Sequence, residues 1–273
     1  ATSASPSTPT IRSSQVRVES HPMLTDPLFY LGAIPAVMLY GVAKGGFAGP
    51  IAVLSVPLMA LVMSPTQAAA ILLPILVLMD ALVVRTYWGL FDMQALKLLL
   101  PPAMLGVGLG YFTAEFMNDD YMRLLIGVIS LAFGLQTLVS FKVDQSRAHH
   151  GASAGLFGTI AGFTSFSIHA GGPPFSMYLI PRGLSPLTYA GTAGIFFAVV
   201  NLVKLFPYYL LDQLALDNLT LSLVLMPLAP LGVKIGHWLV QRSDPKTDYG
   251  IISLCLVLLG TMLAWQGLQG VMH

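Results

Sequence analysis

Charged side chains are scarce in this chain: aspartate, glutamate, lysine and arginine together make up 9% of its 273 residues. Soluble domains usually carry about 25% charged residues, whereas apolar residues reach 55% here and the mean hydropathy is +0.76. A soluble protein of this length could not bury so much apolar surface, so the sequence predicts a polytopic membrane protein. The formal net charge of +1 also argues against nucleic acid as a partner.

Cysteine and catalytic motifs are scarce as well. The single cysteine, Cys255, lies in an apolar run and excludes an internal disulfide. The sequence has no His/Cys metal-ligand spacing, no Walker glycine loop and no G-x-S-x-G motif. We therefore expect a protein that is not an enzyme and has no cofactor. Without a nucleotide-binding motif, any uphill transport would need an ion gradient or a separate partner.

Two glycine- and proline-rich breaks interrupt the long apolar runs. Residues 44–50 read KGGFAGP and residues 168–174 read IHAGGPP. Glycine and proline together stop a helix, and a proline at the first helical position begins the next one. Inside a membrane such a break is tolerated where the backbone is buried in protein or lines a cavity, and paired breaks point to a transporter's binding site. The alternative is a pair of breaks that merely lets helices pack closely.

The two halves of the chain also align outside the breaks. The matching segments, in the same order in both halves, are Ser64-Pro65 with Ser185-Pro186, Asp80 with Asn201, and LGVGLGYF (105–112) with LGVKIGHW (231–238). The GxxxG glycines in the last pair, Gly106 with Gly110 and Gly232 with Gly236, are expected to allow close helix contact. The sequence therefore predicts one transporter domain made by tandem duplication.

We expect an all-α polytopic membrane protein of two inverted structural repeats. Each repeat has a broken or re-entrant helix pair plus three transmembrane helices, and this odd number of crossings inverts the second repeat. If one short segment crosses alone, the parity changes. The predicted boundaries are a disordered N-terminal tail at 1–26, repeats at 27–141 and 152–270, and a cytoplasmic linker at 142–151.

Lysine and arginine in the short connections predict the orientation, because cytoplasmic loops carry an excess of both. One side collects Arg85, Lys97, Lys142, Arg147, Arg182, Arg242 and Lys246. The other side has Arg12, Arg17 and Arg123 together with Glu115, Asp119, Asp120, Asp212 and Asp217. We expect the first side to be cytoplasmic, both chain termini to lie outside, and the protein to be a multi-pass protein of the cell inner membrane.

The breaks themselves are the predicted binding site. Unpaired backbone N–H groups and the helix dipole make the half-helix starts near Pro50 and Pro174 suitable for a small anion. The glycines that would let a ligand approach the backbone are Gly45, Gly46, Gly49, Gly171 and Gly172.

Ionisable side chains at membrane depth are functional candidates by default. Lys44 would hold the charge of the anion, His169 would donate a hydrogen bond or carry a proton, and Ser165 would add a hydroxyl. The plainer alternative makes Lys44 a snorkelling side chain and His169 a packing residue. His169 and Asp80 are the coupling candidates, although a structural ion pair near Arg85 is an equal alternative for Asp80. Lys204, near the outer end of its span, is expected to snorkel.

At these residues the chain resembles the sulfite exporter TauE/SafE family of membrane permeases. The segments that carry the resemblance are GVAKGGFAGP at 41–50 and AGFTSFSIHAGGPPFSMYLIP at 161–181, together with the twofold repeat. The resemblance extends from about residue 28 to 268. It implies secondary transport of small sulfur-containing anions such as sulfite, sulfoacetate or aryl sulfonates, in a direction that it does not decide.

The sequence and the resemblance together predict a secondary transporter that moves sulfite or an organosulfonate across the membrane by alternating access. Its expected partners are the anionic substrate, the lipid bilayer and a coupling ion, proton or sodium; a homodimer is an open possibility. A passive anion channel is the alternative. An intramembrane enzyme would need a nucleophile and a base, for which only His169 with Ser165 or Ser167 offers a pattern.

Overall fold

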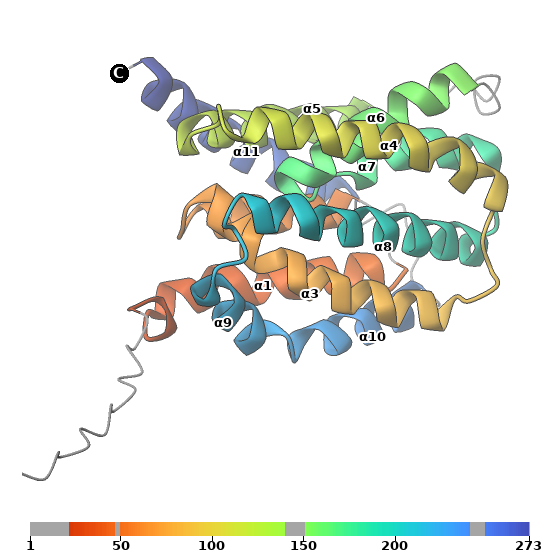
Figure 1. Ribbon diagram of the computed structural model, residues 1–273, viewed down its shortest axis with the longest axis horizontal. Helices are drawn as coiled ribbons and strands as arrows, with labels where there is room; N and C mark the ends of the chain where they lie inside the picture. The colour runs from red at the N-terminus through yellow and green to blue at the C-terminus, as the bar shows by residue number, and fades with distance from the viewer. Residues whose placement is uncertain (1–21, 47–49, 140–150, 241–248, 273) are drawn as a thin grey trace, which may run out of the picture.

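The computed structural model describes residues 22–46, 50–139, 151–240 and 249–272, and within these ranges every regular element is a helix. The helices run side by side along the long axis of the molecule (Figure 1). In chain order they are η1 (Pro22–Leu24), α1 (Pro27–Lys44), η2 (Pro50–Leu54), α2 (Ser55–Ala60), α3 (Pro65–Thr86), α4 (Met93–Ala114), α5 (Asp119–Val139), α6 (Gly151–Ile168), α7 (Gly172–Leu179), η4 (Ile180–Arg182), α8 (Pro186–Leu210), α9 (Leu216–Leu225), α10 (Leu228–Val240) and α11 (Tyr249–Met272). The all-helical prediction is confirmed.

The matched Ser-Pro pairs mark equivalent helix starts in the two halves. The Ser64 hydroxyl accepts a hydrogen bond from the Gln67 N–H, and the Ser185 hydroxyl accepts one from the Thr188 N–H, each over 3.2 Å. In both helices the following proline occupies the first helical position, where its missing N–H costs nothing. The same local chemistry therefore starts α3 and α8.

Five helices among the described residues are long and apolar enough to cross a membrane: α1, α3, α4, α8 and the Ser253–Met272 part of α11. The pair α9 and α10, bent by 46°, would make a sixth span. Large apolar side chains on α4 point outward, and Leu105 and Phe112 are 68% and 70% exposed. Such a surface is suited to lipid rather than water, and the protein is a multi-pass membrane protein.

Each short segment folds back on the helix before it. In the first half, the Ser55 hydroxyl on α2 donates to the Ala36 carbonyl of α1 over 2.8 Å, and Gly32 lies against Val62 just after α2. In the second half, Gly171 lies against Ala161 and Ser165 of α6. Both predicted broken pairs are therefore helical hairpins, although α1, with 18 residues, is also long enough to cross by itself.

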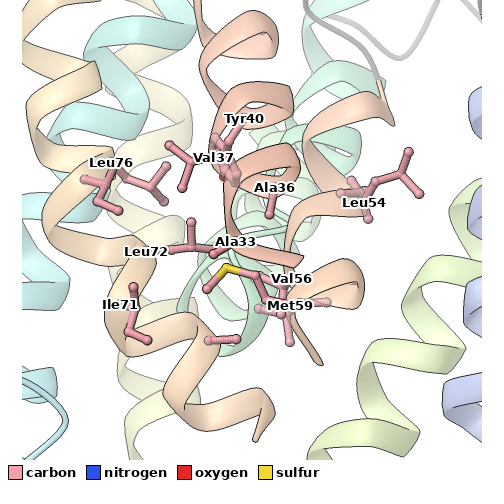
Figure 2. Close-up of a cluster of buried hydrophobic side chains, with 14 of the residues drawn as sticks. Ala33, Ala36, Val37, Tyr40, Leu54, Val56, Met59, Ile71, Leu72 and Leu76 are labelled. Atoms are coloured by element: carbon pink, nitrogen blue, oxygen red, sulfur yellow. The ribbon is translucent and has the colours of Figure 1, made fainter. Parts of the chain in front are cut away.

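The first hairpin packs its apolar face on α3. Figure 2 shows this cluster, which brings together Ala33, Ala36, Val37 and Tyr40 of α1, Leu54, Val56 and Met59 of the return segment, and Ile71, Leu72 and Leu76 of α3. These side chains are all at most 7% exposed. Their burial against α3 fixes where the break after Lys44 lies in the bundle.

Equivalent helices of the two halves meet and run in opposite directions. Between α3 and α8, Val83 lies against Gly194, and Asp80 accepts a hydrogen bond from Asn201. Since the earlier residue of α3 contacts the later residue of α8, the two helices are antiparallel. On the pair α5 and α11, Gly127 lies against Ala264, whereas Gly134, further along α5, lies against the earlier Val257 of α11.

Close glycine contacts hold the other two large helix pairs together. Gly106 of α4 lies against the backbone of Thr159 and Phe163 on α6, and Gly110 lies against Phe166. In the other half, Gly232 and Gly236 of α10 lie against α1 at Gly41 and Val42. The prediction that these GxxxG glycines serve close helix contact is confirmed.

Apart from the buried Lys44, Asp80 and Lys204, charged residues that the structure describes gather at the two ends of the bundle. Arg85 near the end of α3, Lys97 in the first turn of α4 and Arg182 of η4 lie where α3 joins α4, at the right in Figure 1. Arg123, Asp119 and Asp120 at the start of α5 lie at the opposite end, where α1 begins and α11 finishes. The other predicted cytoplasmic charges, Lys142, Arg147, Arg242 and Lys246, lie outside the described residues, as do most of the 142–151 linker and Arg12 and Arg17 of the tail.

Two glycines of α4 give a matched test of the α4–α6 contact. A Cβ at Gly106 would meet the Phe163 backbone nitrogen at 2.7 Å, whereas a Cβ at Gly108 meets nothing within 4 Å. We expect Gly106→Ala to destabilise the protein by about 1–3 kcal/mol through overpacking. Gly108→Ala should instead stabilise it by up to about 1 kcal/mol, since alanine favours helix. Thermal unfolding of the purified variants in detergent measures both, and equal melting temperatures would contradict the close contact.

Candidate functional site

A cavity, partly open to the surroundings, lies where the two breaks approach each other. We call it the central cavity. The end of α1, η2, the last two turns of α3, the α6–α7 break and the first half of α8 form its wall. Its lining includes Tyr40, Lys44, Gly46, Asp80, His169, Gly172, Phe175, Ser176, Tyr189, Ala193 and Phe197.

Lys44 and Asp80 form an ion pair in the wall of this cavity. Their side chains are only 9% and 3% exposed, and Asn201 donates from its amide nitrogen to the second carboxylate oxygen of Asp80 over 2.6 Å. A buried charge is tolerated when it is paired and hydrogen-bonded. Asp80 thus belongs to a structural ion pair, but its partner is Lys44 across the break and not the nearby Arg85.

A second buried cation lies behind the cavity. The Lys204 ammonium is 2.7 Å from the Ser165 carbonyl oxygen, 3.2 Å from the Ser165 hydroxyl and 2.8 Å from Nδ1 of His169. The side chain is fully buried, so the expectation that Lys204 snorkels is wrong. The physical reason is that α8 packs on α3 in the interior of the bundle, which turns this face of α8 towards the α6 break instead of the lipid.

The hydrogen bonds of His169 assign its tautomer. Nε2 lies 2.8 Å from the carbonyl oxygen of Ala69, which can only accept, so Nε2 carries the proton. Nδ1 is then the acceptor for the Lys204 ammonium. A neutral imidazole beside a charged lysine satisfies every one of these bonds.

The backbone at His169 adopts an unusual conformation. Its φ of +54° lies in the left-handed region, which is uncommon for residues other than glycine, although asparagine, aspartate and histidine adopt it more often than other side chains. The Tyr40 hydroxyl donates to the His169 carbonyl over 2.6 Å, and the His169 N–H donates to the Ser165 carbonyl over 3.1 Å. Tyr40 of the first half therefore holds the break of the second half.

The predicted glycines divide into two groups. Gly46, at φ +127°, and Gly172, which has open space beside its Cα, line the central cavity. Gly45 and Gly171 instead serve packing: Gly45 lies against Gly236 and His237 of α10, and Gly171 lies 2.7 Å, measured to an ideal Cβ, from the Ala161 carbonyl. Gly49 lies outside the described residues.

Tyr87 follows the last residue of α3 and hydrogen-bonds the backbone of the first break. Its hydroxyl donates to the Gly45 carbonyl over 2.8 Å and lies 2.9 Å from Nδ1 of His237. Burial raises the pKa of Tyr87, so the phenol stays a neutral donor at physiological pH.

The half-helix starts near Pro50 and Pro174, which the sequence analysis treats as an equivalent pair, differ in structure. The α7 start borders the central cavity through Gly172. In the first half, Pro50–Leu54 forms a 3-10 turn and the α-helix begins only at Ser55. Pro57 has no N–H to donate to the Val53 carbonyl, so one α-helical hydrogen bond is missing at this turn.

Aromatic residues and Lys204 are the parts of the site that the sequence analysis missed. The Lys44 ammonium lies 5.8 Å from the Tyr40 ring centroid and 5.5 Å from that of Phe197, within range of cation–π attraction. The hydroxyls of Tyr189 and Ser176 are hydrogen-bonded to each other over 2.7 Å. Aromatic residues are common in apolar helices, so their type alone carries no signal, whereas the repeat alignment did single out Asn201.

The serine–histidine pattern required for an enzyme is not formed. Both ring nitrogens of His169 are engaged by Lys204 and Ala69, and the Ser167 hydroxyl donates to the Phe163 carbonyl over 3.0 Å. Among the described residues, no group of three or more His, Cys, Asp or Glu could hold a metal ion.

Comparison with known proteins identifies the family. The model of the family described as "Sulfite exporter TauE/SafE" matches residues 33–263, which include both breaks and all the cavity residues discussed above. No curated protein and no solved structure matches the chain. Because the family match covers most of the sequence, the chain belongs to the sulfite exporter TauE/SafE family of membrane permeases.

Proposed function

We propose that this protein is a secondary transporter that moves a small sulfur-containing anion, sulfite or an organosulfonate such as sulfoacetate, across the cell inner membrane. Family membership implies a sulfite or sulfonate membrane transporter. The anion binds in the central cavity beside Lys44, with Gly46, Gly172 and the α7 start giving it access to backbone N–H groups.

The charge of the buried cluster is the observation that carries this proposal. The described charged side chains of the cluster are two lysines, Lys44 and Lys204, and one carboxylate, Asp80, while the hydrogen bonds of His169 fit its neutral form. With both lysines protonated and Asp80 ionised, one positive charge has no carboxylate partner in this largely desolvated region. Because an uncompensated buried charge is costly, an anion in the cavity would stabilise the cluster.

An inverted repeat and alternating access complete the proposed mechanism. The antiparallel contacts of α3 with α8 and of α5 with α11 support inversion, because these are equivalent helices of the proposed repeats 27–141 and 152–270. The two hairpins would enter from opposite membrane faces. The face that carries Arg85, Lys97 and Arg182 would be cytoplasmic, by the excess of positive charge there.

Proton coupling through Asp80 follows from competition for Lys44. An anion that enters the cavity meets a lysine already paired with a carboxylate. Protonation of Asp80 removes that competitor, so proton uptake and anion binding would favour each other. The charged or titratable groups around Asp80 are Lys44 on α1, Lys204 on α8 and His169 after α6. His169 is a second candidate for the proton, and sodium is the alternative coupling ion.

Uptake of labelled sulfite or sulfoacetate into proteoliposomes under an imposed pH gradient tests the binding site. We expect Lys44→Gln to reduce uptake about tenfold or more, since the anion loses its buried partner charge. Lys97→Gln removes a positive charge from an exposed position of α4 and should leave uptake unchanged. The double variant Lys44→Gln/Asp80→Asn removes the unpaired carboxylate, so loss of uptake in this variant cannot come from a stranded charge. Uptake by the double variant equal to that of the wild type would contradict the site, and large unitary currents would indicate a channel.

Binding as a function of pH tests the coupling. In the wild type, anion affinity should rise as the pH falls, because the protonated form of Asp80 no longer competes for Lys44. We expect Asp80→Asn to bind the anion with little pH dependence and to take it up independently of the pH gradient. Titration of both proteins with sulfoacetate by calorimetry at several pH values measures this, with His169→Gln as the comparison. Asp80→Asn that keeps the wild-type pH dependence, together with a pH-independent His169→Gln, would assign the proton to His169 instead.

A further inference from the structure

A second, smaller cavity lies on the far side of His169 from the central cavity. We call it the distal cavity. Its wall comes from the start of α3, the end of α4, the start of α5 and the end of α8, through residues such as Thr66, Thr113, Met122 and Tyr208. These ends lie at the left in Figure 1, opposite the α3–α4 connection near which the central cavity lies. Of the described residues, none lines both cavities.

The wall between the cavities is one layer of side chains deep at His169. His169 lines the central cavity, and its Nε2–H donates to the carbonyl of Ala69, which lines the distal cavity. On α8, Lys204 holds Nδ1 of the imidazole, and one turn later Tyr208 lines the distal cavity with its ring centroid 6.2 Å from that of His169. We call His169, Lys204 and the Ala69 carbonyl the partition.

The partition is held by hydrogen bonds between helices and not by a continuous helix. α6 ends at Ile168, and His169 follows in the left-handed conformation. Tyr40 from α1, Ala69 from α3 and Lys204 from α8 each hold one group of His169. Relative movement of these helices would therefore break the partition without unwinding a helix, as alternating access requires.

The distal cavity has no described group that would hold an anion tightly. Among the described residues that line it, none is charged, and its polar groups are those of Thr66, Thr113, Ser167, Tyr208 and Gln213. The Thr113, Ser167 and Tyr208 hydroxyls donate to main-chain carbonyls, so their hydrogens do not point at a ligand. The Thr66 hydroxyl bonds the Asp119 carboxylate over 3.3 Å, which adds negative charge beside the cavity.

We propose that the distal cavity is the second vestibule of the transport path, through which the hydrated anion reaches or leaves the opposite membrane face. The partition at His169 separates it from the anion-binding central cavity. This inference rests on the proposed function, because it assigns the second half of the same path.

Cysteine labelling from each membrane face tests the two-vestibule arrangement. The chain has one cysteine, so Cys255→Ser provides the background. Thr113→Cys reports on the distal cavity and Ala193→Cys on the central cavity. Leu105→Cys, on the lipid-exposed face of α4, is the matched control. Each variant is treated with a membrane-impermeant anionic methanethiosulfonate in right-side-out and in inside-out vesicles.

We expect Thr113→Cys to react about tenfold or more faster from one face, and Ala193→Cys to react by the same factor faster from the other face. Leu105→Cys should react slowly from both. Adding His169→Ala should make Thr113→Cys reactive from the central-cavity face as well. Thr113→Cys that reacts from the same face as Ala193→Cys, or from neither face, would overturn the second vestibule.

Labelling and transport separate the two proposals. If Thr113→Cys and Ala193→Cys label from opposite faces but no sulfur anion is taken up, the substrate assignment fails and the vestibules stand. If uptake requires Lys44 but Thr113 is not reachable from the opposite face, the second vestibule fails and the binding site stands. If the His169→Ala protein does not fold, labelling of Thr113→Cys and Ala193→Cys in the protein that keeps His169 still tests the second vestibule.

Discussion

The buried ion pair between Lys44 and Asp80 is the interaction on which the rest of the site depends. A lone lysine at membrane depth would cost several kcal/mol, and the carboxylate of Asp80 beside Lys44 offsets part of that cost in the cavity wall. Asp80 in turn is held by Asn201, its own counterpart in the second half of the chain. The Lys44–Asp80 pair and Asn201 therefore connect the first break with α3 and α8. The net charge of the cavity wall changes when Asp80 takes up a proton.

The second half supplies the complementary arrangement. There the lysine is on the long helix, as Lys204 of α8, and its partners Ser165 and His169 are at the break. In the first half the lysine is at the break and the carboxylate is on the long helix. The two halves thus place their polar residues differently around the breaks, and His169 lies between the central cavity, which Lys44 and Asp80 line, and the distal cavity, whose described lining is uncharged.

Much of the fold could be predicted from the sequence because it depends on local chemistry. Ser-Pro starts, glycine–proline breaks and long apolar runs determine helix ends within the chain: α3 and α8 begin at the Ser-Pro pairs, and α1 and α6 end at the two breaks. Lys44 and His169 were identifiable because ionisable residues next to a break are rare. The environment of Lys204 was not, since nearly uniform apolar helices do not reveal which face meets protein and which meets lipid. For the same reason the sequence could not separate the cavity glycines, Gly46 and Gly172, from the packing glycines, Gly45 and Gly171.

The central claim is that the anion binds at Lys44 in the central cavity and displaces Asp80. The most direct measurement is a crystal structure with selenite, an oxyanion analogue of sulfite that is located by the anomalous scattering of selenium. The account predicts a selenium peak beside the Lys44 ammonium and Gly172, with the Asp80 carboxylate moved away from Lys44. A peak elsewhere, with the Lys44–Asp80 pair intact, would contradict it.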